Sequence, residues 1–241
     1  MSAGGPYGGR VAVVTGARRG IGRLVAEHLL AGGAQVVGLS RAADAVIEHP
    51  AYQHLAADVA DDAAVRAAFR EIARHHGRLD LLVNAAAVLT SQYVLLLPGG
   101  KAEEMVRTNL LGPVLTCREA AKLMTRARYG RIVNVSSMAA VLEPPGDAVY
   151  AATKAALATF GNVLAKELGR VGVTVNTLGV TAYPTDMLAA LPADKVAAVI
   201  AALPIPRAAT REDLLHALDF LLSESSGYVT AQTLHLGGVH A

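Results

Sequence analysis

Apolar runs rich in β-branched residues alternate along the chain with segments whose apolar residues recur at helical spacing. Val11–Val14 is such a run, and Val25 and Leu29 lie four apart in the segment that follows it. Strands are predicted at 11–14, 34–39, 52–57, 79–84, 130–136, 172–178 and 232–236, and helices at 21–31, 61–76, 101–126, 150–170 and 210–222. This alternation is typical of βαβ units. We therefore expect an α/β fold, a Rossmann-like, doubly wound parallel sheet of about seven strands with helices on both faces.

Helix signals and the absence of a linker indicate one domain. Asp61 and Asp62 are suitable N-terminal caps for the helix after the third strand, and Gly77 is suited to end it. The sequence carries no internal repeat, low-complexity linker or break in composition, so residues 1–241 are expected to form a single dinucleotide-binding domain. Residues 1–10 are Gly-rich and are expected to form a flexible tail.

Composition narrows the class of protein. With 241 residues, 53% of them hydrophobic, the chain can bury a large core. A net charge of +2 with 17% charged residues argues against a dedicated nucleic-acid binder. The single cysteine, Cys117, excludes an intrachain disulfide and is expected to be buried in a helix. Because no apolar run is long enough to span a bilayer or form a signal peptide, we expect a protein of the cytoplasm without a membrane partner.

A glycine-rich turn follows the first strand. Thr15–Gly22 places glycines at 16, 20 and 22, directly after an apolar strand and before a helix. In that context, backbone N–H groups and the start of the helix can cradle a pyrophosphate. Glycines also mark ordinary turns, which is the alternative interpretation. The flanking strand and helix favour the nucleotide.

A tyrosine and a lysine are placed to share one helical face. Tyr150 and Lys154 are four residues apart, and Ser137, thirteen residues before Tyr150, ends a strand. A nearby cation favours phenolate and lowers the pKa of a tyrosine, so Tyr150 is a candidate general acid/base and Ser137 a candidate hydrogen-bond partner of the same substrate oxygen. A solvated helix face that carries a Tyr and a Lys is the commoner meaning of so short a pattern. The rest of the chain favours catalysis.

Together these motifs resemble the short-chain dehydrogenase/reductase family, from Val11 to the segment 230–235. The catalytic residues implied by the resemblance are Asn109, Ser137, Tyr150 and Lys154. The implied cofactor-binding residues are Gly16, Arg18, Arg19, Gly20, Ile21, Gly22, Ser40, Arg41, Asp58, Val59, Asn84, Ala85, Ala86, Tyr150, Lys154, Val180, Tyr183 and Thr185. In this family, the pair matched by Asp58 and Val59 contacts the adenine.

The resemblance implies hydride transfer between a nicotinamide and a carbonyl carbon. Tyr150 would protonate the forming alkoxide, and Ser137 would position that oxygen. Lys154 would lower the pKa of Tyr150 and bind the nicotinamide ribose, while Asn109 would support Lys154 through a water molecule. The cofactor carries the chemistry, and the protein supplies orientation and electrostatics.

Charge at the end of the second strand bears on the choice of cofactor. Enzymes that prefer NAD usually carry Asp or Glu there, whereas an arginine nearby accommodates the 2′-phosphate of NADP. Here Ser40 occupies the acidic position, Arg41 follows it, and Arg19 precedes Gly20. Each arginine alone could be a solvated surface residue. Because both are present and no carboxylate is in place, we expect NADP(H).

Three segments depart from the family pattern. The usual Asn-Asn-Ala-Gly is here Asn84–Ala87, the usual Pro-Gly is Val180–Thr181, and the usual Asp-Gly-Gly is Leu236–Gly238. One interpretation is that the fold tolerates these substitutions and that the reaction is unchanged. An enzyme with altered chemistry, such as isomerisation, dehydration or cyclisation, is another. A cofactor-binding regulatory protein without turnover is a third, and the intact catalytic set weighs against it.

The expected pocket residues are mostly apolar, which favours a hydrophobic ketone, or an acyl or polyketide-type intermediate, over a sugar. They are Val88, Leu89, Tyr93, the segment 138–149 with Leu142, Pro144 and Pro145, and the segment 182–191 with Tyr183, Met187 and Leu188. The expected function is thus an NADPH-dependent oxidoreductase that reduces a ketone or oxidises the matching secondary alcohol. The substrate's identity, the direction and the stereochemistry are left open.

Partners follow from charge and from the resemblance. A basic cluster could receive an acidic acyl carrier protein, as in related β-ketoacyl reductases, or be a solvated face; it comprises Arg126, Arg128, Arg131, Lys166 and Arg170. The family usually assembles as tetramers through the helices expected at 101–126 and 150–170 and the last strand, so we expect a homodimer or homotetramer. The eight histidines have no metal-binding spacing, and no metal is expected.

Overall fold

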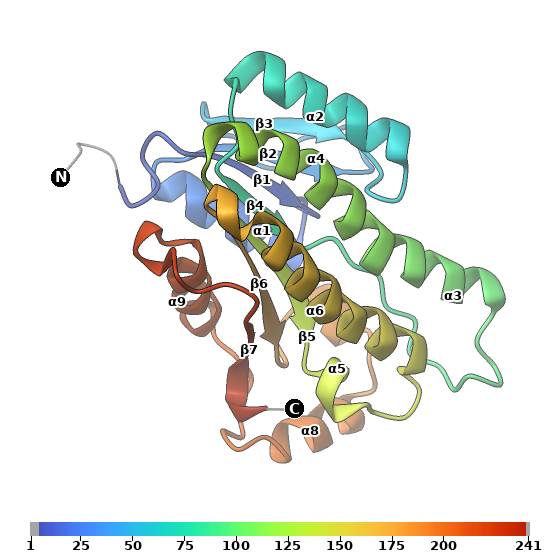
Figure 1. The fold of residues 1–241 in the computed structure, drawn as a ribbon. Coiled ribbons are helices and arrows are strands. Elements are labelled where there is room, and N and C mark those ends of the chain that lie inside the picture. Colours follow the sequence, from blue (N-terminus) through green and yellow to red (C-terminus); the bar gives the residue numbers. More distant parts are fainter. Residues whose placement is uncertain (1–4, 240–241) are drawn as a thin grey trace.

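The strands form one fully parallel sheet. The computed structural model describes residues 5–239, and its seven strands lie in the order β3-β2-β1-β4-β5-β6-β7 (Figure 1). They are β1 (Val11–Thr15), β2 (Gln35–Ser40), β3 (Tyr52–Ala56), β4 (Leu81–Asn84), β5 (Gly130–Ser137), β6 (Val173–Val180) and β7 (Thr233–His235). Each lies within two residues of its expected bounds. The prediction of a doubly wound parallel sheet is confirmed.

Helices cover both faces of the sheet. One face packs against α1 (Gly20–Ala31) and α9 (Arg211–Leu222), and the other against α2 (Asp62–His76), α4 (Gly112–Ala127) and α6 (Ala148–Leu168). The remaining helical elements are α3 (Gly99–Val106), η1 (Arg107–Leu111), α5 (Ala139–Leu142), η2 (Gly169–Val171), α7 (Asp186–Ala189), α8 (Ala193–Ala201), η3 (Glu224–Ser226) and η4 (Leu236–Gly238). Of these, α5, α7, α8, η3 and η4 lie outside the helices expected from the sequence.

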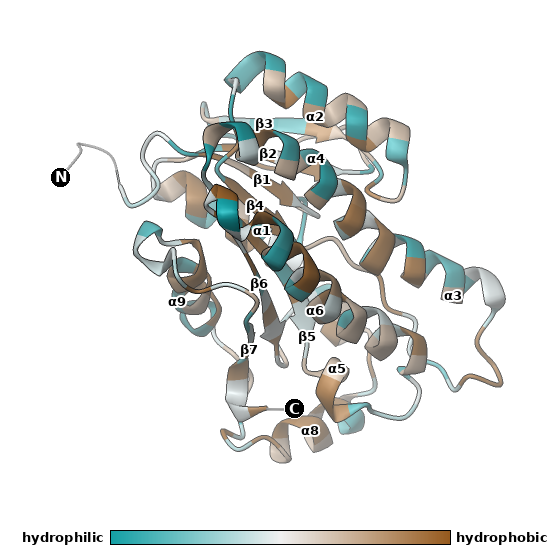
Figure 2. Ribbon diagram, in the orientation of Figure 1, coloured by the Kyte–Doolittle hydropathy of each residue, from teal (hydrophilic) through white to brown (hydrophobic). Residues whose placement is uncertain are grey.

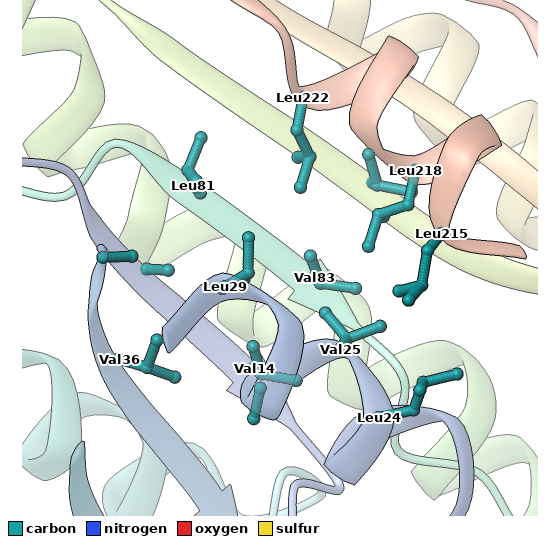
Figure 3. Packing of buried hydrophobic residues seen from close by; sticks show 14 of the residues in the cluster. Val14, Leu24, Val25, Leu29, Val36, Leu81, Val83, Leu215, Leu218 and Leu222 are labelled. Atoms are coloured by element: carbon teal, nitrogen blue, oxygen red, sulfur yellow. The ribbon is translucent and has the colours of Figure 1, made fainter. Parts of the chain in front are cut away.

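Central strands bury side chains on both faces, as parallel sheets between two helical layers do. All five residues of β1 are buried; Val13 packs toward α2 and α4, and Val14 toward α1. Figure 2 shows hydrophobic colouring along these strands, whereas the edge strand β3 is pale. Figure 3 shows Leu29 of α1 and Leu218 of α9 meeting Val14 and Val83 over one face. The two cores fix the carboxyl ends of the strands, where the expected site residues lie.

The helix expected at 101–126 is interrupted by a π turn. Helices α3 and α4 are joined through η1, which contains Asn109. Pro113 lies in the first turn of α4, and because a proline has no N–H, it cannot donate the ordinary helical hydrogen bond to Asn109 O. A π turn inside an α-helix accommodates such a mismatch and is frequent at functional sites.

The predicted caps of α2 are found in part. Asp61 is the N-cap, and its carboxylate accepts hydrogen bonds from Ala63 N and Ala64 N, at 2.8 and 3.2 Å. Gly77 ends the helix in the left-handed conformation, with φ of 67°. Asp62 is instead the first helical residue, and its carboxylate pairs with Arg118 of α4. Only Asp61 therefore caps this helix.

The N-terminal segment differs from the flexible tail expected at 1–10. Residues 1–4 lie outside the described residues, but Tyr7 is only 5% exposed and packs with the core that contains α1. Its hydroxyl donates a hydrogen bond to Asp219 of α9. The glycine-rich composition of this segment suggested flexibility. A single tyrosine is enough to anchor it, because Tyr7 buries its ring and still hydrogen-bonds through its hydroxyl.

We expect Tyr7→Ala to destabilise the protein by about 3 kcal/mol, because it leaves a cavity under the N-terminal segment and removes a hydrogen bond. Urea denaturation measures the change. The matched control is Tyr228→Ala, since Tyr228 is fully exposed and its loss should cost little. Equal stabilities of the two variants would show that the segment is not anchored by Tyr7.

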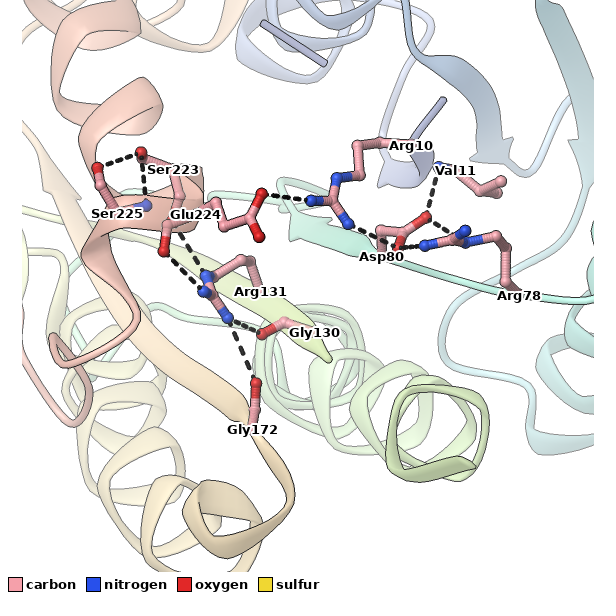
Figure 4. A network of polar contacts seen from close by, with 10 residues as sticks. All are labelled: Arg10, Val11, Arg78, Asp80, Gly130, Arg131, Gly172, Ser223, Glu224 and Ser225. Atoms are coloured by element: carbon pink, nitrogen blue, oxygen red, sulfur yellow. Dashed lines mark hydrogen bonds and ion pairs between the residues drawn. The ribbon is translucent and has the colours of Figure 1, made fainter. Parts of the chain in front are cut away.

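One member of the expected basic cluster is a structural residue. Arg131 is 4% exposed and donates hydrogen bonds to the carbonyl oxygens of Ser223, Glu224, Gly172 and Gly130 (Figure 4). The other members lie at the ends of α4 and α6 and in η2, beside the amino end of β5. Arg131 is therefore not available to a partner, and the basic cluster named from the sequence loses this member.

Within residues 5–239, no helix combines the length and the hydrophobicity needed to cross a membrane.

Candidate active site

A cavity of about 660 Å³ opens at the carboxyl ends of the central strands. Its walls come from the β1–α1 turn, the segment after β4, the end of β5, the start of α6, and the segment from the end of β6 to α8. Strand order reverses between β1 and β4, the place where open α/β sheets bind their ligands. The fold therefore puts this cavity where the sequence motifs meet.

The glycine turn is packed so closely that side chains would not fit. Gly16 has φ of +71°, and a Cβ there would lie 2.9 Å from Ala86 Cα. A Cβ at Gly22 would lie 2.3 Å from Gly16 O. Both contacts are too short for a real Cβ, so these two positions require glycine. The Thr15 hydroxyl accepts hydrogen bonds from Ala85 N and Ala86 N, each at 3.0 Å, which ties the turn to the segment after β4.

Helix α1 presents an unblocked N-terminus to the cavity. It begins at Gly20 after Arg19, no side chain among the described residues caps it, and its first turn carries no acidic residue. Gly20, Ile21 and Gly22 all line the cavity. A helix N-terminus offers free N–H groups and a positive dipole end to an anion. These residues fit the pyrophosphate of a dinucleotide.

Tyr150, Lys154 and Ser137 meet in the cavity wall. Tyr150 and Lys154 lie in α6 and are 8% and 3% exposed, and Ser137 ends β5. Ser137 Oγ accepts a hydrogen bond from Ala139 N at 3.1 Å and lies close enough to the Tyr150 phenol to act on its pKa. Lys154 Nζ donates to Val135 O at 2.8 Å and lies 5.7 Å from the centre of the Tyr150 ring. The predicted cluster of these three side chains is present in the structure.

The pKa of Tyr150 differs in direction from the expectation. Burial raises it to about 12; the hydrogen bond from Ser137 opposes this rise, and the Asp147 carboxylate adds to it. Burial also lowers the pKa of Lys154 to about 8. The expected fall in the pKa of Tyr150 is not found, because desolvation by burial is the largest influence on this group and raises its pKa. At neutral pH, Tyr150 is therefore a protonated acid.

Asn109 is fully buried behind the cavity wall. Its Oδ1 accepts from Val88 N at 2.8 Å, and its Nδ2 donates to Val88 O at 2.9 Å and to Thr153 Oγ1 at 3.3 Å. Asn109 thereby fastens the segment after β4 to the helix that carries Tyr150. Its support of Lys154 through a water molecule stays a prediction.

The structure brings most of the expected cofactor residues to the cavity. Those that line it are Gly16, Arg19, Gly20, Ile21, Gly22, Arg41, Ala85, Ala86, Tyr150, Lys154, Val180, Tyr183 and Thr185. Those outside its lining are Arg18, Ser40, Asp58, Val59 and Asn84.

Polar contacts account for several of the residues outside the lining. The Arg18 guanidinium pairs with Asp44 at 2.5 Å, and Ser40 Oγ hydrogen-bonds His54 Nε2 at 3.0 Å. Asn84 is buried and accepts a hydrogen bond from Thr116 Oγ1 at 2.7 Å. The arginines left at the cavity from the expected cofactor set are Arg19 and Arg41, with Arg41 3.8 Å from Glu104.

Two of the departures from the family pattern reach the cavity. Ala87 and Thr181 both line it. Thr181 packs against the third departure, because a Cβ at Gly237 would lie only 2.8 Å from Thr181 Cγ2. Gly237 thus makes room for the threonine, and the two substituted segments pack as a unit.

Part of the lining was missed by the sequence interpretation. Val88, Leu89, Met138, Leu142, Pro144, Met187 and Leu188 line the cavity as expected, whereas Tyr93 and Pro145 lie outside its lining. The unexpected lining residues include Thr90, Ser91, Lys101, Glu104, Pro192, Lys195, Val196 and Val199. Most come from short helices and loops that show no clear periodic pattern in the sequence.

The described residues offer little support for thiol or metal chemistry. Cys117 is buried in α4, as expected, and burial raises the pKa of its thiol to about 12, so it is an inert neutral group. Across residues 5–239, no cluster of three or more His, Cys, Asp or Glu side chains could hold a metal ion.

Comparison with known proteins gives consistent matches. A family model described as short chain dehydrogenase matches residues 10–196. The 3-oxoacyl-(acyl-carrier-protein) reductase FabG of Escherichia coli K12 is 32% identical over 237 residues, which cover 96% of this chain and 97% of that protein. The protein of the same name from Vibrio harveyi is 34% identical, over 95% and 96% of the two chains.

Solved structures agree with the fold. A protein of Sinorhizobium meliloti 1021, named as a candidate short-chain alcohol dehydrogenase, superposes with a TM-score of 0.89 at 28% identity, and 97% of each chain is covered. A candidate gluconate dehydrogenase from Agrobacterium tumefaciens gives a TM-score of 0.87 at the same identity and coverage.

Proposed function

Because the chain belongs to the short-chain dehydrogenase family, we propose that it is an NADP(H)-dependent ketoreductase that converts a ketone to a secondary alcohol. The observation that carries this proposal is the meeting of Tyr150, Lys154 and Ser137 in the cavity wall. Reduction of a carbonyl needs an acid at the oxygen, and a tyrosine with a pKa of about 12 is fully protonated at neutral pH.

The chain's own residues supply a proton and hold the oxygen. A reduced nicotinamide, when bound, supplies a hydride to the carbonyl carbon. Tyr150 then gives its proton to the alkoxide that forms, and Ser137 donates a hydrogen bond that positions this oxygen. Lys154, charged below about pH 8, stabilises the phenolate left on Tyr150. Each turnover consumes one proton, which Tyr150 regains from solvent.

We propose an acyl or similarly hydrophobic substrate. The cavity wall away from the glycine turn is largely apolar, with Leu89, Leu142, Met187 and Leu188 among its residues. The named relatives act on 3-oxoacyl groups carried by acyl carrier protein. Within one chain, the basic residues of α4, α6 and η2 lie near the amino ends of β5 and β6, whereas the cavity lies at the carboxyl ends of the strands, so they do not support docking of a carrier beside it.

Cofactor preference rests on the two arginines at the cavity. We expect Arg41→Ala to weaken NADPH binding by about 30-fold and to leave NADH nearly unaffected, because a charge-assisted hydrogen bond to phosphate contributes about 2 kcal/mol. Arg19→Ala should behave alike. Fluorescence titration with both nucleotides measures the ratio. Arg18→Ala is the matched control, since Arg18 pairs with Asp44 and lies outside the lining. Parallel losses of NADPH and NADH affinity in Arg41→Ala would contradict a 2′-phosphate contact.

The function itself is tested by titration followed by turnover. Tight NADPH binding and its oxidation with 3-oxoacyl thioesters or hydrophobic ketones are the expected results. Tight binding without oxidation of any member of the panel would favour the second candidate, a changed reaction. The observation behind that candidate is that Ala87 and Thr181 line the cavity where the family usually has glycine.

We also propose a homo-oligomer in a reducing compartment. Val106, Leu111 and Val163 on α3, η1 and α6 are 44%, 36% and 50% exposed, an apolar surface suited to a second copy. A chain whose one cysteine, Cys117, is buried and unpaired fits a reducing compartment such as the cytoplasm. Sedimentation velocity measures the assembly.

A further inference from the structure

A lysine of α8 joins three parts of the cavity wall. Lys195 Nζ lies 2.8 Å from Ser91 Oγ, 3.1 Å from Asp147 Oδ1 and 3.3 Å from Pro145 O. Ser91 belongs to the segment after β4, and Asp147 directly precedes α6, three residues before Tyr150. Ser91, Asp147 and Lys195 all line the cavity. The site chemistry described above uses none of them as a reacting group.

Lys195 contacts a part of the cavity wall that is held together without it. Ser91 Oγ donates to Asp147 Oδ1 at 2.5 Å, and Gln92 N donates to Gly146 O at 2.7 Å. These bonds join the segment 90–92 to the loop 144–147 independently of α8. Asp147 is only 5% exposed, so its carboxylate depends on the hydroxyl and the ammonium for compensation. The wall therefore presents a buried negative group toward α8.

The segment that carries Lys195 has few other anchors. Every residue of α7 and α8 keeps part of its surface exposed, and α8 lies at the lower rim of the molecule in Figure 1, away from the main helical layers. Met187, Leu188 and Val196 from this segment line the cavity. A fully exposed ion pair contributes little to stability. This pair is partly buried, since the Lys195 side chain is 26% exposed and that of Asp147 only 7%, so it holds the segment more strongly than an exposed pair would.

We propose that Lys195 is a positioning residue whose ion pair with Asp147 holds α7 and α8 closed over the substrate end of the cavity. Substrate enters and product leaves when this pair opens. The inference rests on the proposed function, in that the cavity is taken as the ketone pocket. Lys195 then acts through α7 and α8 on substrate binding, and neither on the cofactor turn nor on the proton given by Tyr150.

Steady-state kinetics of single and double variants test this role. We expect Lys195→Met to raise KM for the ketone about tenfold, the equivalent of about 1.4 kcal/mol, with kcat within about threefold and NADPH affinity unchanged. Lys195→Arg should restore KM. Lys195→Met combined with Asp147→Asn should be no worse than the poorer single variant, because both remove one interaction. Lys166→Met, in the exposed surface near the far end of α6, is the matched control for loss of a lysine.

The contrary kinetic results are equally definite. An unchanged KM in Lys195→Met, or multiplied effects in the double variant, would overturn the proposal. A fall in kcat at constant KM would also overturn it, since that pattern belongs to a residue that acts only in the transition state.

Hydrogen exchange separates this inference from the function. Backbone amides of residues 186–201 should exchange about tenfold faster in Lys195→Met than in the native protein, while those of β5 stay unchanged. This measurement needs no substrate. Equal exchange in the two proteins would overturn the proposed role of the Lys195–Asp147 ion pair, whatever substrate the enzyme reduces. If exchange is faster but the protein reduces no ketone, the role of the ion pair in holding α7 and α8 stands and the proposed function is contradicted.

Discussion

Tyr150→Phe is expected to lower turnover by about 10³-fold while NADPH affinity stays within twofold, because the substitution removes only the hydroxyl that protonates the substrate oxygen. The ring is retained, so the packing of this nearly buried residue against Ala139 and Ala151 is preserved. Ser137 loses its phenol partner but remains at the end of β5. Binding and chemistry should therefore separate cleanly in this variant.

Turnover and NADPH titration on the same preparation provide the check. Tyr228→Phe is the matched control, since Tyr228 is fully exposed and its hydroxyl lies outside the cavity lining. Native turnover in Tyr150→Phe would remove the tyrosine from the mechanism. A large loss of NADPH affinity would show that the hydroxyl serves cofactor binding more than proton transfer.

Lys154→Met is expected to abolish most turnover and yet stabilise the fold. The pKa of Lys154 falls from 10.5 to about 8 on burial. Each pKa unit corresponds to about 1.4 kcal/mol, so the buried ammonium costs about 3 kcal/mol at pH 7. Loss of the hydrogen bond to Val135 O offsets about 1 kcal/mol of this. A net gain of about 2 kcal/mol is expected at pH 7.

The pH dependence of that gain has a definite sign. Between about pH 8 and 10.5 the unfolded chain binds a proton at Lys154 that the folded chain has lost, so the native protein regains stability as pH rises. The advantage of the methionine variant should be largest below pH 8 and disappear above pH 10. Denaturation across this range measures it, with the exposed Lys166→Met of the same helix as control. A constant difference at all pH values would rule out ionisation as its cause.

The fold could be predicted because its signals are repeated. Buried parallel strands such as Val11–Thr15 read as continuous apolar runs, and each helix between them carries an apolar stripe. The π turn at Arg107–Leu111 escaped prediction because helical periodicity does not register one extra residue. Tyr7 escaped because its anchor, Asp219, is distant in the sequence. Local patterns are therefore informative about elements and silent about such long-range contacts.

In the site, too, local patterns predicted some features and long-range contacts escaped prediction. Tyr150, Lys154 and Ser137 could be brought together from helical spacing and strand position, and the structure has them side by side. The pKa of Tyr150 was expected to fall, because spacing reveals the neighbouring charge and not the depth of burial. Asp147 and Lys195 are 48 residues apart in the sequence, with α6, β6 and α7 between them, so only the folded chain reveals their pairing.

Transfer of deuterium tests the central claim most directly. The protein is mixed with NADPH that carries deuterium at the transferred position of the nicotinamide, together with a 3-oxoacyl thioester or hydrophobic ketone, and the product is examined by mass spectrometry. The account predicts a secondary alcohol with one deuterium on the former carbonyl carbon, formed by the native protein and about 10³-fold more slowly by Tyr150→Phe. Tight NADPH binding with no deuterated alcohol from any substrate of the panel would contradict it.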